Sequence, residues 1–288
     1  MGRIAIATCS EFTELEEDDQ LLLAELPEGE AVVWDDPAAD WSSYDLVVIR
    51  STWDYTPRRD QYLAWCDRVG AARLHNPPAV IRWNTDKRYL ADLDAAGLPV
   101  VPTTFLEPGS PLVLTDGPCV VKPTVSAGSR DTARHDHARA AAEHARELLD
   151  AGRVVMVQPY LAEVEEAGET ALLFFDGAYD HAIRKGPMLV DGRAEVSGLF
   201  AAENIAAREP SAAERDVAER VAAYVAERFG GPLLYARVDL LPTPGGPVLL
   251  ELELTEPSLF FAHSEGSPAR YADAIRRRAR AASSAARP

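Results

Sequence analysis

The sequence lacks the features that mark several common protein classes. It contains three cysteines in 288 residues, and Cys9, Cys66 and Cys119 form no CxxC pair. Such scattered cysteines indicate free thiols in a reducing cytoplasm. No apolar run reaches the roughly 18 residues needed to span a bilayer. The N-terminal residues read as a strand followed by acidic residues, not as a signal peptide. We therefore expect a cytoplasmic protein.

An excess of positive charge is also absent. The 29 lysine and arginine residues stand against 46 aspartate and glutamate residues, which gives a formal net charge of −17. An acidic surface of this kind repels nucleic-acid phosphates and anionic lipid. We therefore expect neither nucleic acid nor a membrane among the partners.

Familiar nucleotide-binding and catalytic motifs are missing as well. The sequence has no G-x-G, no GxxxxGK[ST] loop, no GxSxG and no HExxH. These absences disfavour a dinucleotide-binding fold of the ordinary kind, a P-loop NTPase, an α/β-hydrolase and a zinc metallopeptidase.

The first third of the chain alternates between strands and helices. Apolar strand-like segments cover residues 3–9, 30–34 and 45–50, and helical patterns cover residues 16–26 and 57–70. Near-continuous apolar strands separated by helices indicate a parallel sheet that is covered on both faces. We predict a small βαβ-type α/β domain.

A polar and aromatic segment directly follows the third of these strands. Open parallel sheets bind ligands beyond the carboxyl ends of their strands. A guanidinium, hydroxyls, a carboxylate and aromatic rings suit a small zwitterion such as an amino acid. We expect Arg50 or Arg184 to bind the carboxylate of such a substrate and Asp54 to bind its ammonium group. The alternative is that residues 50–55 form an ordinary polar loop without a binding role. The candidate substrate-binding residues here are Arg50, Ser51, Trp53, Asp54 and Tyr55.

A β-hairpin with opposed charges is predicted around Gly245. Its strands cover residues 233–241 and 248–254. Because side chains alternate with a period of two, the charged residues share one face and apolar residues fill the other. The opposed charged pairs are Asp239 with Glu251 and Arg237 with Glu253. The apolar core face holds Ala236, Val238, Leu240, Leu250, Leu252 and Leu254.

Directly opposed carboxylates repel each other. At about 5 Å and an effective dielectric constant near 20, each pair costs roughly 3 kcal/mol. A cation would relieve this repulsion, and oxygen ligands without histidine or cysteine suit Mg²⁺ or Mn²⁺. The alternative is a solvated acidic face of the sheet.

A second hairpin is predicted to turn at residues 176–177, an Asp-Gly pair. Its register sets Glu169 opposite Arg184, and Lys185 then points to the other face unless a β-bulge intervenes. Glu169 and Arg184 are candidate site residues; the alternative is that they form an ordinary cross-strand ion pair, worth at most about 1 kcal/mol if exposed.

Weaker signals lie between these segments. Residues 84–87 begin a predicted helix that carries Lys87 in its first turn, and Lys122 ends an apolar strand. Residues 126–130 are small and flexible enough for backbone amides to approach an anion. Residues 158–161 close another apolar strand. Each signal is weak by itself.

Taken in order between residues 84 and about 260, these motifs resemble those of ATP-grasp enzymes. They are most similar to the branch that holds glutathione synthetase, D-alanine–D-alanine ligase and the RimK-type ligases. The resemblance implies an α+β ATP-grasp fold in which two α+β subdomains clasp ATP. It divides the chain into an N-terminal substrate-binding domain (1–83), a small lid subdomain (84–160) and a large subdomain with the metal site (161–288).

The resemblance also implies roles for individual residues. The two lysines and the small-residue loop would bind the ATP phosphates, residues 158–161 the adenine, and one glutamate the ribose. The ATP-binding residues would be Lys87, Lys122, Ser126, Gly128, Ser129, Gln158, Pro159, Leu161 and Glu169. The ligands of two Mg²⁺ ions, or of Mn²⁺ in their place, would be Asp239, Glu251 and Glu253. The catalytic residues would be Arg237, Lys122 and Arg184.

One departure from the family pattern concerns the metal site. Glu253 stands where many relatives have asparagine, which adds negative charge and could change the metal preference. Residues 255–259 also lack the glycine that is usual in the loop after the last metal position of the family.

Three segments resemble ligases related to D-cycloserine synthetase, which close O-ureido-D-serine into a ring. They are residues 50–55, the turn at 174–177 with Arg184 and Lys185, and residues 251–258. The resemblance implies a ligase that activates the carboxylate of an amino-acid-like substrate as an acyl phosphate. A nitrogen of amine or hydroxylamine type then forms a C–N bond, and ADP and phosphate are released. Arg184 and Lys185 would contact the substrate.

Other functions stay open from the sequence. A ligase that joins two separate substrates and a non-catalytic nucleotide-binding protein are the alternatives. A monomer or a homodimer is expected.

Overall fold

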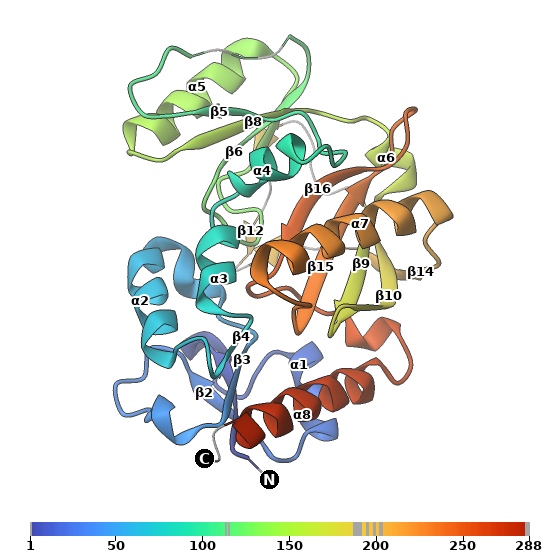
Figure 1. Cartoon of the computed structure of the whole chain (residues 1–288). Helices are drawn as coiled ribbons and strands as arrows, with labels where there is room; N and C mark the ends of the chain where they lie inside the picture. Colours follow the sequence, from blue (N-terminus) through green and yellow to red (C-terminus); the bar gives the residue numbers. More distant parts are fainter. Residues whose placement is uncertain are drawn as a thin grey trace.

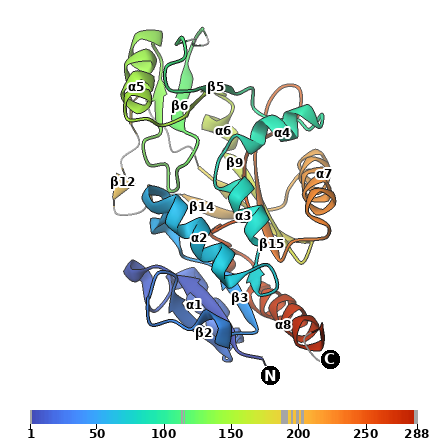
Figure 2. The ribbon, with the colours of Figure 1, turned by 60° about the vertical axis from the view of Figure 1, so that its left-hand side comes forward.

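The computed structural model describes residues 2–112, 114, 116–186, 192–193, 196–197, 200–201 and 204–285. Within these ranges the strands form three larger sheets and one two-stranded ribbon, β12 (Val196–Ser197) with β13 (Phe200–Ala201). The sheet from the N-terminal segment and the sheet from residues 104–193 lie at opposite ends of the molecule, and the third sheet lies between them (Figures 1 and 2).

The N-terminal sheet has four parallel strands in the order β2-β1-β3-β4. They are β1 (Ile4–Thr8), β2 (Gly29–Val33), β3 (Leu46–Ile49) and β4 (Leu74–His75). Every residue of β1 and β3 is buried, which explains their unbroken apolar sequence. The helices of this region are α1 (Glu17–Glu25), α2 (Arg59–Val69) and α3 (Pro78–Asn84). The predicted βαβ-type domain is confirmed.

A second sheet of five strands has the order β11-β7-β6-β8-β5. Its strands are β5 (Thr104–Leu106), β6 (Cys119–Pro123), β7 (Ala133–His135), β8 (Val155–Pro159) and β11 (Gly192–Arg193). Helix α5 (Ala138–Asp150) buries Ala141, Ala145 and Leu148 in a small apolar core with strand residues such as Val121. The short helix α4 (Tyr89–Ala95) precedes this sheet in the chain.

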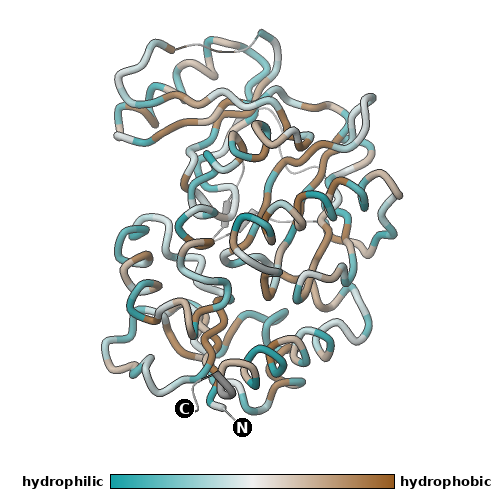
Figure 3. Tube along the Cα trace, in the orientation of Figure 1, coloured by the Kyte–Doolittle hydropathy of each residue, from teal (hydrophilic) through white to brown (hydrophobic). Residues whose placement is uncertain are grey.

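The third sheet has five strands in the order β14-β10-β9-β15-β16 and is antiparallel. They are β9 (Glu169–Phe175), β10 (Ala178–Lys185), β14 (Ile205–Arg208), β15 (Tyr235–Leu241) and β16 (Val248–Glu253). The short helix α6 (Val164–Ala167) leads into β9. Hydrophobic residues concentrate along the strands, as Figure 3 shows.

Two long helices cover the third sheet. Helix α7 (Ala212–Phe229) begins at a capping box of Ser211 and Glu214 and ends at Gly230, whose left-handed φ of 80° suits glycine. Helix α8 (Ser267–Ala285) packs against β9 and also against α1 and β3 of the N-terminal region. The core between α8 and the N-terminal region includes Tyr271 and Ile275 of α8 together with Ile4 of β1 and Leu22 of α1. None of the described helices is both long and apolar enough to cross a membrane.

The predicted register of the β15–β16 hairpin is confirmed for its two pairs of charged residues. Arg237 pairs with Glu253 and Asp239 with Glu251. The register then shifts after Asp239, so that Leu249 and not Leu250 is buried against the core. The expectation for Leu250 was wrong because a bulge, which adds one residue to a strand, reverses the faces beyond it.

The predicted register of the β9–β10 hairpin holds beside the turn, where Ala178 pairs with Phe175 and Tyr179 with Phe174, but the predicted pairing of Glu169 with Arg184 is wrong. A shift between Tyr179 and His181 places Lys185 opposite Glu169, and Arg184 pairs with Thr170. The bulge lies close to the Asp-Gly turn, so it moves every later side chain of β10 to the other face.

The helix expected to begin at residues 84–87 is divided differently in the structure. Asn84 is the last residue of α3, and α4 begins only at Tyr89. The Asn84 side chain donates to the carbonyl of Leu252 (2.7 Å) and accepts from the amide of Leu254 (2.7 Å). It therefore joins α3 to strand β16 and does not cap a helix.

Candidate active site

A cavity of about 370 Å³ is lined by residues from segments that lie far apart in the chain. This volume is in the range of small-molecule sites. Its walls include residues of the N-terminal region, of the β6–β8 region and of the β15–β16 hairpin. Fifteen predicted site residues line it: Trp53, Tyr55, Lys87, Lys122, Ser126, Gly128, Ser129, Gln158, Pro159, Leu161, Glu169, Lys185, Arg237, Glu251 and Glu253.

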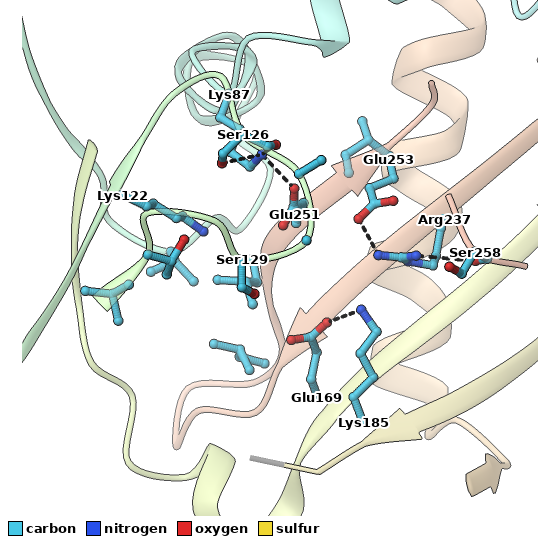
Figure 4. Close-up of a pocket in the computed structure, with 18 of the residues that line it drawn as sticks. Lys87, Lys122, Ser126, Ser129, Glu169, Lys185, Arg237, Glu251, Glu253 and Ser258 are labelled. Atoms are coloured by element: carbon cyan, nitrogen blue, oxygen red, sulfur yellow. Dashed lines mark hydrogen bonds and ion pairs between the residues drawn. The ribbon is translucent and has the colours of Figure 1, made fainter. Parts of the chain in front are cut away.

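Two lysines face the cavity from different elements (Figure 4). The Lys87 ammonium donates to the carbonyl of Ser126 (2.7 Å) and pairs with Glu251 (3.1 Å). Burial lowers the pKa of Lys87, but the Glu251 carboxylate outweighs it and raises the pKa overall. Lys122 forms no ion pair among the described residues, and burial lowers its pKa.

The loop between β6 and β7 supplies small residues to the same wall. Ser126, Ala127, Gly128 and Ser129 all line the cavity. Gly128 and Ser129 have positive φ values of 60° and 58°. Consecutive residues in such conformations can turn backbone amides toward one point, which is how backbone concavities bind anions.

The wall beside this loop is largely apolar. The ends of β6 and β8 contribute Val120 and residues 158–161, and the Gln158 amide donates to the Thr103 hydroxyl (2.9 Å). Leu250, which the bulge turns away from the core, also lines the cavity. A flat apolar group with polar edges is the ligand that such a wall favours.

Arg237 lies at the centre of the charged wall. Its guanidinium donates to Asp239 (2.8 Å), to Glu253 and to the carbonyl of Ser258 (3.3 Å). The ammonium of Lys185 contacts Glu169 and Asp239, each at 2.9 Å. The protein's own cations therefore relieve the carboxylate repulsion that the sequence indicated, with Lys87 as the third (Figure 4).

The carboxylates of this wall differ in their ionisation. Burial tends to raise the pKa of Asp239 and of Glu251, but their lysine and arginine neighbours hold both pKa values below the usual range. Burial raises the pKa of Glu169 and of Glu253 to about 7. Glu256 has its pKa raised to about 8 by burial and by the charge of Glu253.

The three predicted metal ligands are not equally placed. Glu251 and Glu253 line the cavity with about a quarter of each side chain exposed (25% and 27%). Asp239, which pairs with Glu251 in the strand register, is 1% exposed and is not among the residues that line the cavity. Within the described residues no three His, Cys, Asp or Glu side chains form a ready metal cluster. The oxygen-only donors of Glu251 and Glu253 nevertheless fit a hard cation such as Mg²⁺, and the metal assignment stays a prediction.

Part of the expected substrate segment is used elsewhere. Arg50 is 1% exposed and forms a buried ion pair with Asp19 of α1 (2.7 Å), which also accepts from Ser51. Asp54 accepts from the indole of Trp34 (2.8 Å). None of Arg50, Ser51 and Asp54 lines the cavity. The structure therefore does not place these three side chains in the cavity, because their partners are Asp19 of α1 and Trp34, the residue that follows β2.

Arg184 also points away from the cavity. Its guanidinium donates to the backbone carbonyls of Ala167 (2.6 Å) and Glu166 (2.9 Å) at the end of α6. The β10 bulge exchanges its position with that of Lys185, which does line the cavity. The structure therefore brings Lys185, and not Arg184, to the cavity that holds the other predicted site residues.

Several lining residues escaped the analysis of motifs. They include Glu16, at the start of α1, and Glu256, which follows β16. The Glu16 carboxylate accepts from the amide of Asp18 (2.8 Å) and caps α1. The indole of Trp53 donates to the Glu256 carbonyl (2.9 Å). A glutamate between a threonine and a proline carries no local signal of this contact.

Comparison with known proteins places the chain in a family. Residues 4–76 match the model of the D-cycloserine synthetase DcsG N-terminal domain. The cycloserine biosynthesis protein DcsG of Streptomyces lavendulae is 42% identical over 85% of this chain and 87% of its own length. The crystal structure of D-cycloserine synthetase DcsG superposes with a TM-score of 0.86, at 38% identity over 96% of this chain and 99% of that chain.

More distant structures share the fold. D-alanine–D-alanine ligase from Bacillus anthracis complexed with ATP has a TM-score of 0.66 at 14% identity, over 99% of this chain and all (100%) of that chain. The ATP-grasp ligase PsnB, complexed with minimal precursor, Mg and ADP, has a TM-score of 0.61 at 17% identity, over 96% and 98%. The sequence identity and the shared architecture confirm the predicted ATP-grasp fold: this chain belongs to the D-cycloserine synthetase DcsG family of ATP-grasp ligases.

Proposed function

We propose that the cavity binds ATP with Mg²⁺ and activates the carboxylate of an amino-acid-like substrate. One observation supports this proposal above the others. A single cavity is lined by the two lysines, by the small-residue loop of the β6–β8 region, by Arg237 and by aromatic residues of the N-terminal region. Phosphoryl transfer requires this juxtaposition of anion-binding groups and an acceptor site.

The nucleotide would occupy the side of the cavity near the β6–β8 region. Lys122, which forms no ion pair among the described residues, and the amides of residues 126–129 would bind the phosphates. Gln158 and the apolar wall with Leu250 would hold the adenine. Glu169 would accept hydrogen bonds from the ribose hydroxyls beside its partner Lys185. Structures of the same fold have been solved with ATP and with Mg and ADP, which supports nucleotide binding in this cavity.

The metal would lie at Glu251 and Glu253, with Asp239 paired with Glu251 in the strand register. When bound, Mg²⁺ would neutralise phosphate charge and orient the phosphoryl group. We propose that this site binds two metal ions and that Mn²⁺ can replace Mg²⁺. The extra carboxylate of Glu253, relative to asparagine, is compensated here by Arg237.

The reaction would proceed in two steps. A substrate carboxylate oxygen attacks the γ-phosphorus of ATP, ADP leaves, and an acyl phosphate forms. A nitrogen then attacks the carbonyl carbon, a C–N bond forms, the nitrogen loses a proton and phosphate leaves. Arg237 stabilises the negative charge of the phosphoryl group as it is transferred, and a closed cavity protects the acyl phosphate from water.

The substrate class follows from the family. Membership of the D-cycloserine synthetase family favours an intramolecular nitrogen, as in ring closure of O-ureido-D-serine. Incubation with ATP, Mg²⁺ and O-ureido-D-serine should release ADP and phosphate, and mass spectrometry should detect a cyclic product. A product that contains a second amine would show a ligase of two substrates, and absence of a hydroxamate after hydroxylamine trapping would refute acyl phosphate chemistry.

We also infer a cytoplasmic location. The three cysteines are free and buried, as expected for a protein kept in a reducing compartment.

A further inference from the structure

One carboxylate of the cavity, that of Glu256, lies beside aromatic residues of the N-terminal region. Glu256 lines the cavity and forms no ion pair within the part of the chain that the structure describes. Its neighbours in sequence differ, because Glu251 pairs with Lys87 and Glu253 with Arg237. The Glu16 carboxylate also has a partner, because it accepts a hydrogen bond from the Asp18 amide and caps α1.

Two aromatic residues of the N-terminal region fix Glu256 in place. The Trp53 indole donates to the Glu256 carbonyl (2.9 Å), and the Tyr55 hydroxyl interacts with its carboxylate. Phe12 packs edge-on against Trp53, with ring centroids 5.3 Å apart. The carboxylate is therefore held at a set position between two parts of the fold, as a recognition group must be.

A desolvated carboxylate that forms no ion pair carries an energetic cost. Burial and the nearby Glu253 raise the pKa of Glu256 to about 8. A ligand that brings a positive charge would remove this cost and favour the ionised carboxylate. Tyrosine and tryptophan rings beside the carboxylate add attraction for a cation.

We propose that Glu256, framed by Trp53 and Tyr55, binds the ammonium group of an α-amino-acid substrate whose carboxylate lies toward Arg237. This inference rests on the proposed function and deepens it, because it names the group that selects an amino acid over a simple carboxylic acid. It replaces Asp54, which the structure uses to bind Trp34.

The test compares two carboxylic acids that differ only in the amine. O-Ureido-D-serine and 3-(ureidooxy)propanoate, in which hydrogen replaces the amino group, are assayed by ADP release. The wild-type enzyme should prefer the amine-bearing compound by about 100-fold in kcat/KM, as expected for a charge-assisted hydrogen bond in a partly buried site. In Glu256→Gln the preference should fall below about 5-fold, and the KM for ATP should change less than about twofold.

Three further variants control this result. Glu265→Gln removes an exposed carboxylate outside the cavity and should keep the wild-type preference. Glu256→Asp retains the charge and should keep part of the preference. Tyr55→Phe should reduce it several-fold. If Glu256→Gln does not fold, as judged by thermal unfolding, unchanged preference in both Glu256→Asp and Tyr55→Phe overturns the proposal.

The outcomes separate this inference from the function on which it rests. A wild-type enzyme that releases no ADP with either compound contradicts the proposed substrate class. Turnover by the wild type together with an unchanged preference in a folded Glu256→Gln contradicts the amine subsite alone. A rise in the KM for ATP with no change in amine preference also overturns the subsite.

Discussion

At the scale of single residues, the two lysines of the cavity show that similar sequence signals can have different physical roles. Lys87 is held by Glu251 and by the carbonyl of Ser126. Lys122 is 7% exposed, and burial lowers its pKa because no ion pair among the described residues offsets the lost hydration. Its charge is therefore costly in the free protein and available to an anionic ligand.

This difference predicts opposite effects on stability. Lys122→Met should raise the free energy of unfolding by up to about 1 kcal/mol, because it removes a poorly compensated buried charge. The same change should raise the KM for ATP at least about tenfold. Lys87→Met should also impair ATP use but should lower stability by about 1–3 kcal/mol, because Glu251 loses its partner. Urea unfolding and ATP kinetics measure both effects, and a Lys122→Met protein less stable than the wild type would contradict this account.

At the scale of secondary-structure elements, the β-bulge in β10 decides which basic residue reaches the cavity. It brings Lys185 to Glu169 and Asp239 and turns Arg184 toward the carbonyls of α6. Side chains alternate with a period of two, so a single extra residue is sufficient for this exchange.

Substitution of the two adjacent residues tests the register. Arg184→Ala should leave kcat/KM within about twofold of the wild type and cost about 1 kcal/mol of stability, the usual contribution of its hydrogen bonds. Lys185→Met should reduce kcat/KM by at least about 100-fold and destabilise the protein, because Glu169 and Asp239 lose a shared cation. Equal loss of activity in both variants would mean that the register described here is wrong.

Asn84 links two elements that bound the cavity. Its side chain, at the end of α3, bonds to the backbone of Leu252 and Leu254 on either side of Glu253. Asn84→Ala should cost about 2–4 kcal/mol in thermal or urea unfolding, because two buried backbone groups lose their partner. Asn84→Asp is the matched control, because it retains an oxygen that accepts from the Leu254 amide and loses only the donor to the Leu252 carbonyl. Its loss of unfolding free energy should be smaller than that of Asn84→Ala. A loss below about 0.5 kcal/mol in Asn84→Ala would exclude this linking role.

At the scale of the whole molecule, segments far apart in sequence meet near the end of β4. His75 of β4 lies near Asp176, in the β9–β10 turn, and Arg278 of α8, and these two residues pair with each other. Burial, followed by the charge of Arg278, lowers the pKa of His75 to about 4. The unfolded chain accepts a proton on this histidine near pH 6.5, whereas the folded chain accepts it only near pH 4.

Stability should therefore depend on pH through His75. Its contribution is unchanged above about pH 6.5 and falls as the pH decreases toward 4, because the unfolded state then binds more protons. The loss should be at most about 3 kcal/mol. His75→Gln should lose less stability than the wild type between pH 7 and pH 5 in urea unfolding. Parallel curves for the two proteins would refute this role of His75.

The sequence alone predicted much of the fold and many of the residues that line the cavity. Unbroken apolar strands gave the parallel N-terminal sheet, and the turn around Gly245 gave the pairing of Arg237 with Glu253. The spacing of Lys87, Lys122 and residues 126–129 indicated groups that the structure brings into one cavity. These features are local, or they follow from the alternation of side chains and from turn geometry.

The remaining features depend on contacts between distant segments. The sequence gives no sign that α1 covers Arg50 with Asp19, that a bulge exchanges Arg184 for Lys185, or that Trp53 reaches the segment of Glu256. Periodicity and composition report which side chains can share a face, and so they determined the sheets and the order of the charged motifs. Only tertiary packing determines which charges are compensated and which remain open to a ligand, because compensation requires partners far away in the chain.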